Sequence, residues 1–282
     1  MLKYYTILLL ISPLISAADN PDFSYDNIKE WGVKNPICNN GKSQSPIKLS
    51  ILTSETNVPD IGDVPPIVFR NYNIQLKNLE MLNNGRTVQI KIPNSEEPPY
   101  IEGALLTNKY KAISLHFHWG SVTTRGSEHL IDDLRYDAEL HIVHQNMAYD
   151  PKEALEKPDG LAVLGFVIKK DIIVPESTGL RKIFADVDRV RYYSSNVTLS
   201  SSLALQEIFD TINTSKFFTY QGSLTTPPCS ESVSWFVFSK PLMLPLLDFL
   251  KLWNIYDENG YAIKNNYRPI QNREGRSVYY RF

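Results

Sequence analysis

The chain of 282 residues contains only two cysteines, and outside one short stretch it contains no histidine. It has no basic block and a net charge of −2, which argues against a broad electrostatic footprint for nucleic acid. Beyond its first residues, no apolar run is long enough to span a membrane, and the last residues do not form a lipid-anchor tail. Repeats, low-complexity tracts and linker-like breaks are also absent. The composition, 43% hydrophobic and 21% charged, is that of an ordinary globular protein and permits a single domain.

The N-terminus has the features of a secretory signal peptide. Lys3 supplies a positive start, residues 7–15 form an apolar stretch, and small residues at 16–18 offer a cleavage site. A membrane anchor is the alternative, but a spanning helix needs about 20 apolar residues, and this run is short and contains Pro13. We therefore predict a signal peptide over residues 1–17 and a secreted domain over residues 18–282 without a transmembrane segment.

The two cysteines, Cys38 and Cys229, suggest one disulfide in an exported chain. Two free buried thiols are the alternative. Asn-x-Ser/Thr sequons at Asn196 and Asn213 fit the same compartment, so both asparagines are candidates for glycosylation, although such triplets also arise by chance.

Short apolar runs separated by turn residues predict a mainly β fold. The strand candidates are residues 67–69, 74–76, 88–92, 112–119, 137–143, 161–168 and 232–238. An Asn-Asn-Gly turn occupies residues 83–85, between strand-like flanks. Short helices are suggested at residues 151–156, 202–209 and 246–253. The pattern predicts one mainly β domain with peripheral helices.

All the histidines lie between positions 116 and 144. His116 and His118 are two residues apart on a predicted strand, so both imidazoles face the same side. His141 follows on a second predicted strand, and if the two strands are adjacent, three imidazoles can converge on one ion. Neutral imidazole favours zinc, and three protein ligands leave one position for water, as in a catalytic site.

The other two histidines are weaker ligand candidates. His144 is three residues from His141 and therefore faces the opposite side of a strand. His129 lies in a loop beside Glu128, and either residue of that pair could still be a ligand on sequence grounds alone. A single histidine is usually a hydrogen-bonded core residue. The His-x-His pattern followed by a third strand histidine favours a metal site instead.

Several segments together resemble the α-class carbonic anhydrases of the secreted, extracellular type. The main segments are Leu-His-Phe-His-Trp-Gly at residues 115–120, Gly-Ser-Glu-His at 126–129, Ala-Glu-Leu-His at 138–141 and Gly-Ser-Leu-Thr-Thr-Pro-Pro at 222–228. Residues 44–47, 83–85, 159–165 and 266–269 add to the match, which covers nearly the whole mature chain in the family's order. The resemblance implies a central twisted, mostly antiparallel, ten-stranded mixed sheet with zinc at the base of a cone-shaped cleft.

The resemblance also implies the reaction, which is the reversible hydration of carbon dioxide to bicarbonate and a proton. Zinc held by His116, His118 and His141 would lower the pKa of its bound water from 15.7 to about 7, and the resulting zinc-bound hydroxide would attack carbon dioxide. Thr225 would accept a hydrogen bond from this hydroxide and donate one to Glu128. Because an ionised carboxylate can only accept, Glu128 would fix the direction of that hydroxyl.

Supporting residues follow from the same resemblance. Glu139 is expected to bond His141, and the carbonyl of Asn266 is expected to hold His118. His129 and His144 are expected to brace the surrounding network. These contacts would fix the orientation of the metal-binding rings.

The position that supports the first ligand departs from the family. Ser114 stands where the family usually has a glutamine beside His116. Serine is shorter, so we expect weaker zinc retention. The substrate pocket implied for carbon dioxide and bicarbonate comprises Val143, Val163, Leu224, Thr226 and Trp235.

The proton path also departs from the family. In the fast members a cleft histidine carries the proton out, but the matching position here is Arg86, which stays protonated and cannot relay a proton. A tyrosine that often orders cleft water is matched by Val33, while Asn84 and Gln89 can still support a water chain. We therefore expect slow, buffer-dependent proton release.

The remaining expectations concern partners and alternatives. Cys38 and Cys229 match the disulfide of the extracellular members, and the bridge would pin the loop that carries Thr225. Sulfonamide-type inhibitors are expected to bind, and the sequence carries no signal for an oligomeric state. The alternative is a secreted binding or matrix protein with the same fold and little catalysis. Another type of zinc hydrolase is disfavoured because a His-Glu-x-x-His motif is absent.

Overall fold

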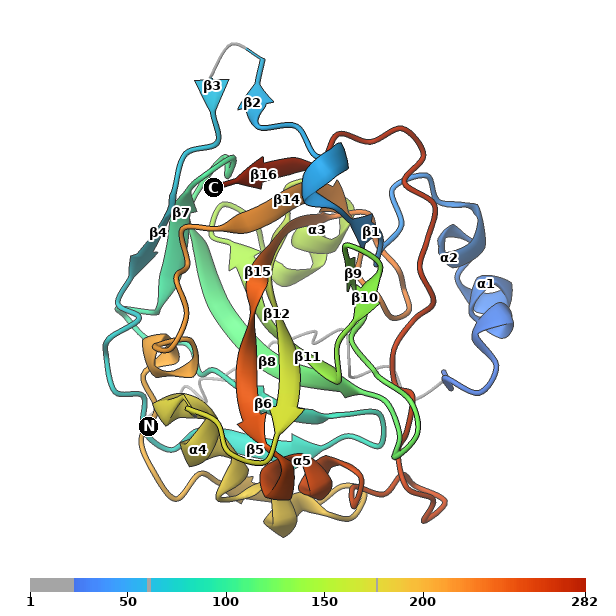
Figure 1. Ribbon diagram of the computed structural model, residues 1–282, viewed down its shortest axis with the longest axis vertical. Helices are drawn as coiled ribbons and strands as arrows, with labels where there is room; N and C mark the ends of the chain where they lie inside the picture. Colours follow the sequence, from blue (N-terminus) through green and yellow to red (C-terminus); the bar gives the residue numbers. More distant parts are fainter. Residues whose placement is uncertain (1–22, 60–61, 176) are drawn as a thin grey trace, which may run out of the picture.

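The computed structural model describes residues 23–59, 62–175 and 177–282 (Figure 1). This part of the chain forms an eleven-stranded mixed sheet, two small accessory sheets and a few short helices. The mainly β fold class is therefore confirmed, with one strand more than expected in the central sheet. The predicted signal peptide, residues 1–17, lies outside the described residues.

The central sheet contains long inner strands and short outer ones. In chain order its strands are β4 (Ile67–Arg70), β5 (Glu80–Asn83), β6 (Val88–Lys91), β7 (Tyr100–Gly103), β8 (Tyr110–Trp119), β11 (Ala138–Asn146), β12 (Leu161–Asp171), β13 (Asn196–Thr198), β14 (Phe217–Gly222), β15 (Val233–Pro245) and β16 (Tyr279–Arg281). The accessory sheets are formed by β1 (Lys48–Leu49), β9 (Leu130–Ile131) and β10 (Leu134–Arg135), and by β2 (Asn57–Val58) and β3 (Gly62–Asp63).

The helices are short and peripheral, as expected. The α-helices are α1 (Trp31–Lys34), α2 (Ile37–Asn40), α3 (Pro151–Glu156), α4 (Thr178–Phe184) and α5 (Leu246–Leu252). The 3₁₀ turns are η2 (Ile28–Glu30), η3 (Ile51–Thr53), η4 (Val187–Val190) and η5 (Leu205–Ile208). The helix predicted at 202–209 is thus a 3₁₀ turn, and the strand predicted at 74–76 is only an isolated bridge between Leu76 and Leu203.

The sheet is mostly antiparallel. Its main path runs β13-β5-β6-β8-β11-β12-β15-β14-β16, with β7 pairing both β8 and β4. Within this sheet β12 and β15 are the parallel pair. Because parallel strands need a long crossover, the chain between them passes through α4, β13 and β14. The Asn-Asn-Gly turn joins β5 to β6, and Gly85 has a positive φ of 80° that suits glycine.

Side-chain alternation gives the central sheet two faces with different contents. On β11, Leu140 and Ile142 belong to the larger hydrophobic core, while Val143 belongs to a second cluster with Trp235. The ring of His141 lies on the second side, with its centroid 4.9 Å from that of Trp235. One face therefore builds the main core, and the other carries the histidines that the sequence singled out.

His144 lies on the main-core face, as the strand periodicity predicts. It is fully buried, its Nε2 is hydrogen-bonded with the hydroxyl of Tyr72, and its Nδ1 lies 3.3 Å from the carbonyl oxygen of Ala162. Burial lowers the pKa of His144 to about 3. It is therefore a neutral histidine of the core, on the other side of the sheet from His141.

Candidate metal centre

Three histidines meet on the second face of the central sheet. His116 and His118 lie on β8, and His141 on β11 pairs directly with His116. One ring nitrogen of each lies within 4.8 Å of those of the other two. The three ring centroids are 4.6 to 5.2 Å apart. Three imidazole nitrogens can therefore reach one ion.

Hydrogen bonds orient two of these rings. His118 donates from Nδ1 to the carbonyl oxygen of Asn266 at 2.7 Å, and His141 donates from Nε2 to Oε1 of Glu139 at 2.9 Å. His118 Nε2 is buried and has no hydrogen-bond partner among the described residues. Each ring thus uses one nitrogen for support and keeps the other for a ligand, which is the usual arrangement of metal-binding histidines.

Two of the rings, those of His116 and His118, are held in the uncharged form that binds metals. Burial lowers the pKa of His116 well below its usual value, and the neighbouring imidazoles of His118 and His141 lower it further. Burial also lowers the pKa of His118, although Glu128 opposes this effect. Neutral imidazole is the ligand form for zinc, so the donor set fits that metal.

Glu128 lies beside the histidine nitrogens and is fully buried. Its Oε1 accepts a hydrogen bond from the backbone N–H of Arg268 at 2.8 Å. Its Oε2 has no hydrogen-bond partner in the described part of the chain and lies 3.6 Å from His118 Nε2 and 4.0 Å from His141 Nδ1. A buried hydrogen-bond acceptor without a donor is rare in proteins. Oε2 of Glu128 is therefore available to accept a hydrogen bond from a further donor at this site.

The two threonines of the candidate site lie in the loop after β14. Thr225 and Thr226 are both buried, with 6% and 9% of their surface exposed. No hydrogen bond joins the Thr225 hydroxyl to Glu128 within the described residues, so this contact stays a prediction.

A buried hydrogen-bond network extends behind His141. His129 lies with Nδ1 2.7 Å from Oε1 of Glu139 and Nε2 2.8 Å from the hydroxyl of Tyr220, which bonds Ser45 at 2.9 Å. Burial would raise the pKa of Glu139, but the charge and hydrogen bond of His129 and the bond from His141 hold it well below its usual value. His129 therefore contacts the network that supports His141, and Tyr220 and Ser45 are members that the sequence did not reveal.

An apolar wall adjoins the histidines. Val143, Val163 and Trp235 are direct neighbours across β11, β12 and β15. All three are buried, and Leu224 belongs to the same hydrophobic cluster. The structure thus brings together the four apolar residues expected to line a carbon dioxide pocket.

Ser114 lies on β8, two residues before His116. It is buried, but no hydrogen bond joins its hydroxyl to the His116 ring in the described ranges. The shorter side chain therefore leaves the first histidine with less support than the other two.

Replacing Ser114 with glutamine is expected to slow zinc loss about tenfold, because partners of metal-binding histidines change metal affinity by 10- to 100-fold. The measurement is zinc release to a chromophoric chelator. Ser114→Val is the control, because valine fills space but neither donates nor accepts a hydrogen bond. This variant should not slow zinc release. Equal rates for the glutamine variant and the parent would contradict this prediction.

Arg86 occupies the predicted shuttle position and is held in an ion pair. Its Nη1 and Nη2 donate to the two carboxylate oxygens of Glu258 at 2.6 and 2.8 Å, and its Nε donates to the carbonyl of Phe23 at 2.6 Å. Burial alone would lower the pKa of Arg86, but the bond to Glu258 raises it overall. The side chain is therefore a fixed cation.

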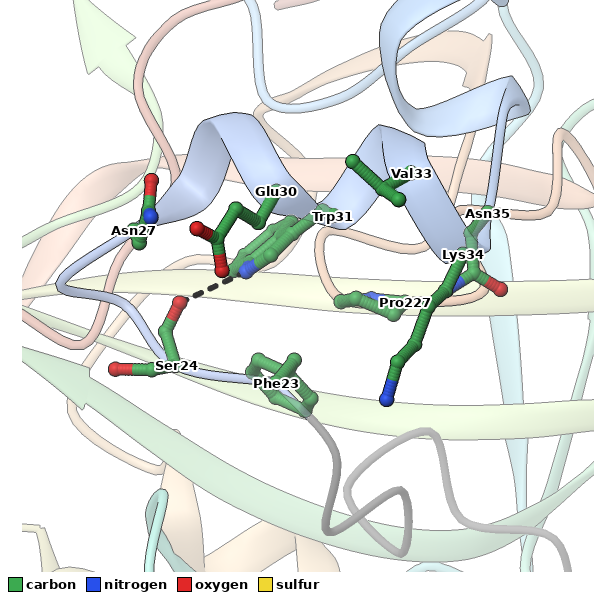
Figure 2. A pocket seen from close by; sticks show the side chains of 9 residues that line it. All are labelled: Phe23, Ser24, Asn27, Glu30, Trp31, Val33, Lys34, Asn35 and Pro227. Carbon is green, nitrogen blue, oxygen red and sulfur yellow. Dashed lines mark hydrogen bonds between the residues drawn. The ribbon is translucent and has the colours of Figure 1, made fainter.

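Val33, which the resemblance matches to a tyrosine that often orders cleft water, lies at the surface. This side chain is 78% exposed and lines a surface pocket of about 490 Å³ between α1 and Pro227 (Figure 2). A partly buried tyrosine of the preceding loop, Tyr25, packs edge-on against Trp31. Its pKa is raised well above the usual value by burial and then by the charge of Glu128. This contact has no local signal in the sequence, because a loop rather than a strand carries Tyr25.

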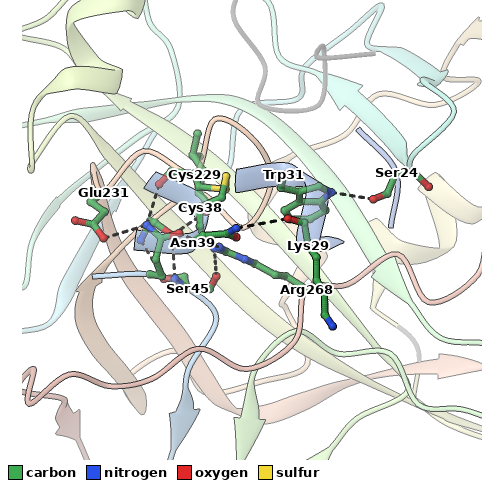
Figure 3. Close-up of a disulfide and its surroundings, with 12 residues drawn as sticks. Ser24, Lys29, Trp31, Cys38, Asn39, Ser45, Cys229, Glu231 and Arg268 are labelled. Atoms are coloured by element: carbon green, nitrogen blue, oxygen red, sulfur yellow. Dashed lines mark hydrogen bonds between the residues drawn. A yellow bond between two sulfur atoms is a disulfide. The ribbon is translucent and has the colours of Figure 1, made fainter. Parts of the chain in front are cut away.

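The predicted disulfide between Cys38 and Cys229 is confirmed (Figure 3). Beside it, the buried guanidinium of Arg268 donates to the carbonyls of Cys38 at 2.5 Å and Ser45 at 2.9 Å. The backbone N–H of the same arginine holds Glu128. The disulfide and the buried carboxylate are therefore connected through a single residue.

Comparison with known proteins agrees with this geometry. The sequence model of the eukaryotic-type carbonic anhydrase family matches residues 26–282. The chain is 36% identical over 252 residues to carbonic anhydrase 6 of Canis lupus familiaris, covering 88% of this chain and 75% of that protein. It is 36% identical over 246 residues to the human protein of the same name, covering 86% and 76%. It is also 36% identical over 245 residues to putative carbonic anhydrase 3 of Caenorhabditis elegans, covering 84% and 89%.

Proposed function

The chain belongs to the eukaryotic-type carbonic anhydrase family, and on this basis we propose that its three-histidine centre hydrates carbon dioxide reversibly to bicarbonate and a proton. The observation that carries the proposal is the approach of three ring nitrogens to within 4.8 Å of one another, beside an apolar wall. His116, His118 and His141 would hold the Zn²⁺ that the family generally requires. A bound zinc ion lowers the pKa of a coordinated water to about 7 and so supplies hydroxide near neutral pH.

The surrounding residues would orient the reacting groups. Glu139 and the carbonyl of Asn266 fix two of the imidazole rings, so each presents a defined nitrogen. Glu128 already uses Oε1 for the N–H of Arg268, which leaves Oε2 to accept from the Thr225 hydroxyl. The oxygen of Thr225 could then only accept from the nucleophile. This arrangement would direct the attacking lone pair toward carbon dioxide.

The apolar wall would bind the substrate. Carbon dioxide has no charge or net dipole, so a wall without polar groups can hold it beside the attacking oxygen. The buried side chains that would form this wall are Val143, Val163, Leu224 and Trp235. Thr226 would help to hold bicarbonate by its backbone or hydroxyl.

Proton release would be the slow stage, because Arg86 is a fixed cation paired with Glu258. Arg86→His is expected to raise turnover in weak buffer at least about tenfold, since a positioned proton-transfer group typically contributes 10²–10⁴. The gain should shrink as buffer concentration rises. Turnover is measured against buffer concentration at fixed pH.

Arg86→Gln is the matched control for this substitution. It also breaks the pair with Glu258 but cannot carry a proton, so it should not raise turnover. An equal gain in both variants would show that the effect comes from releasing Glu258. No gain in the histidine variant would show that proton exit does not limit the rate.

The proposed function is tested by carbon dioxide hydration with purified protein of known zinc content. Activity should fall when a chelator removes zinc, return when zinc is restored, and disappear with a sulfonamide. Full zinc occupancy without hydration would overturn the proposal and favour a binding or matrix protein of the same fold.

We also propose that the protein is secreted. The disulfide is typical of oxidising compartments, and both sequon residues, Asn196 and Asn213, are exposed. Across the described ranges no helix is long and apolar enough to cross a membrane. The mature N-terminus and the mass of protein recovered from the medium would test cleavage after residue 17 and glycan occupancy.

A further inference from the structure

A pocket of about 260 Å³ lies on the face of the central sheet opposite the histidines. Thr219 and Gln221 of β14 contribute to its floor, as does Phe236 of β15. On β15, Trp235 next to Phe236 points to the other face, where it packs against His141. The side chains on the floor therefore point away from the three histidines. Tyr220, whose hydroxyl bonds His129, is the lining residue that the pocket shares with the network behind His141.

Arg276 brings a positive charge to this pocket. Its guanidinium donates to four carbonyl oxygens, namely those of Arg273, Gln221, Gln44 and Asn272. One N–H of Nη1 is left without a partner in the part of the chain that the structure describes, because a guanidinium has five donors.

No carboxylate forms an ion pair with this guanidinium among the described residues. Burial lowers the pKa of Arg276, and it outweighs the nearby charges of Glu231 and Glu274, which would raise that pKa. The residues described as lining the pocket include no acidic side chain. The pocket thus contains a partly desolvated cation whose hydrogen bonds go only to neutral carbonyl oxygens, and such a cation favours an anionic ligand.

The rest of the pocket is suited to an aromatic ring. Leu105 and Tyr279, which are both partly exposed, supply apolar surface. The ring of Tyr220 lies under the guanidinium, with its centroid 5.7 Å from Cζ of Arg276. Because drug-sized ligands occupy pockets of about 300–1,000 Å³, this pocket suits a smaller molecule. The few polar groups of the pocket would orient the ligand, and the apolar side chains would contact its ring.

From these features we propose that the pocket binds a small aromatic carboxylate, with the carboxylate on Arg276 and the ring against Leu105 and Tyr279. The site needs neither zinc nor the proposed reaction. The ligand needs both a carboxylate and an aromatic ring, because the guanidinium of Arg276 binds the carboxylate and the apolar walls of the pocket contact the ring.

Benzoate is the probe, titrated by calorimetry into the zinc-loaded full chain saturated with a sulfonamide. The sulfonamide blocks the metal, which could itself bind a carboxylate. Binding should persist under this condition. It should weaken at least about tenfold for benzamide, because a hydrogen bond to a charged group contributes enough for such a change. Loss of all benzoate binding on adding sulfonamide would assign it to the metal centre and overturn the proposal.

Two variants locate the site. Arg276→Gln should weaken benzoate at least about tenfold, whereas Arg273→Gln removes the same charge outside the pocket and should have little effect. Ser277→Trp keeps Arg276 and fills the pocket, so it should block binding even if Arg276→Gln fails to fold. Unchanged affinity in Ser277→Trp, or equal weakening in both arginine variants, would contradict the proposed site.

Discussion

Replacing His141 with asparagine is expected to abolish zinc binding and to lower carbon dioxide hydration by at least about a thousandfold. His141 is one of three imidazoles whose nitrogens lie within 4.8 Å of one another, and its ring is fixed by Glu139. Two remaining imidazoles would hold zinc weakly, and the pKa of water away from zinc is too high for it to act as a nucleophile at neutral pH. Metal analysis and the hydration rate, measured on the same folded sample, test this prediction.

His144→Asn is the control on the same strand. His144 is equally buried but lies on the core face, where it bonds with Tyr72. Its loss should lower the free energy of unfolding and leave the zinc content and the rate per folded molecule unchanged. A folded His144 variant without zinc, or an active His141 variant, would contradict the assignment of the two faces.

The separation of these histidines was predictable because it depends on local geometry. A strand alternates its side chains every residue, so His116 and His118 had to share a face, and His144 had to oppose His141. No contact with a distant segment is needed for this result. His116 and His118 lie on β8, and His141 lies on β11. These two apolar strands pair directly, which brings the three histidines together.

The contacts that the sequence did not reveal are long-range. Arg86 meets Glu258 across 172 positions, and Tyr220 meets Ser45 across 175. No periodic pattern in the sequence indicates that the two residues of either pair are in contact. The extra strand has a similar cause, since edge strands such as β13 and β16 contain only three residues each and show too little alternation. The packing of Tyr25 against Trp31 was not predictable either, because the loop that carries Tyr25 has no regular pattern.

Removing the disulfide with Cys38→Ser and Cys229→Ser together is expected to lower the free energy of unfolding by about 5 kcal/mol at most. The bridge joins residues 191 positions apart, and closing a loop of that length restricts the unfolded chain strongly. Chemical denaturation of the parent and the variant measures the difference. Reductant should destabilise the parent to the level of the variant and leave the variant unchanged, and a loss below about 1 kcal/mol would contradict the expected role of the loop.

The same substitution should also reduce the rate of the molecules that remain folded. Cys229 follows Thr225 by four positions, and the carbonyl of Cys38 holds the guanidinium of Arg268, whose N–H fixes Glu128. Loosening the bridge therefore affects the loop of Thr225 and the orientation of the carboxylate together. Rates measured well below the unfolding transition, with zinc content equal to that of the parent, isolate this effect. An unchanged rate would mean that the hydrogen bonds of Arg268 hold Glu128 without the bridge, and that the disulfide contributes stability alone.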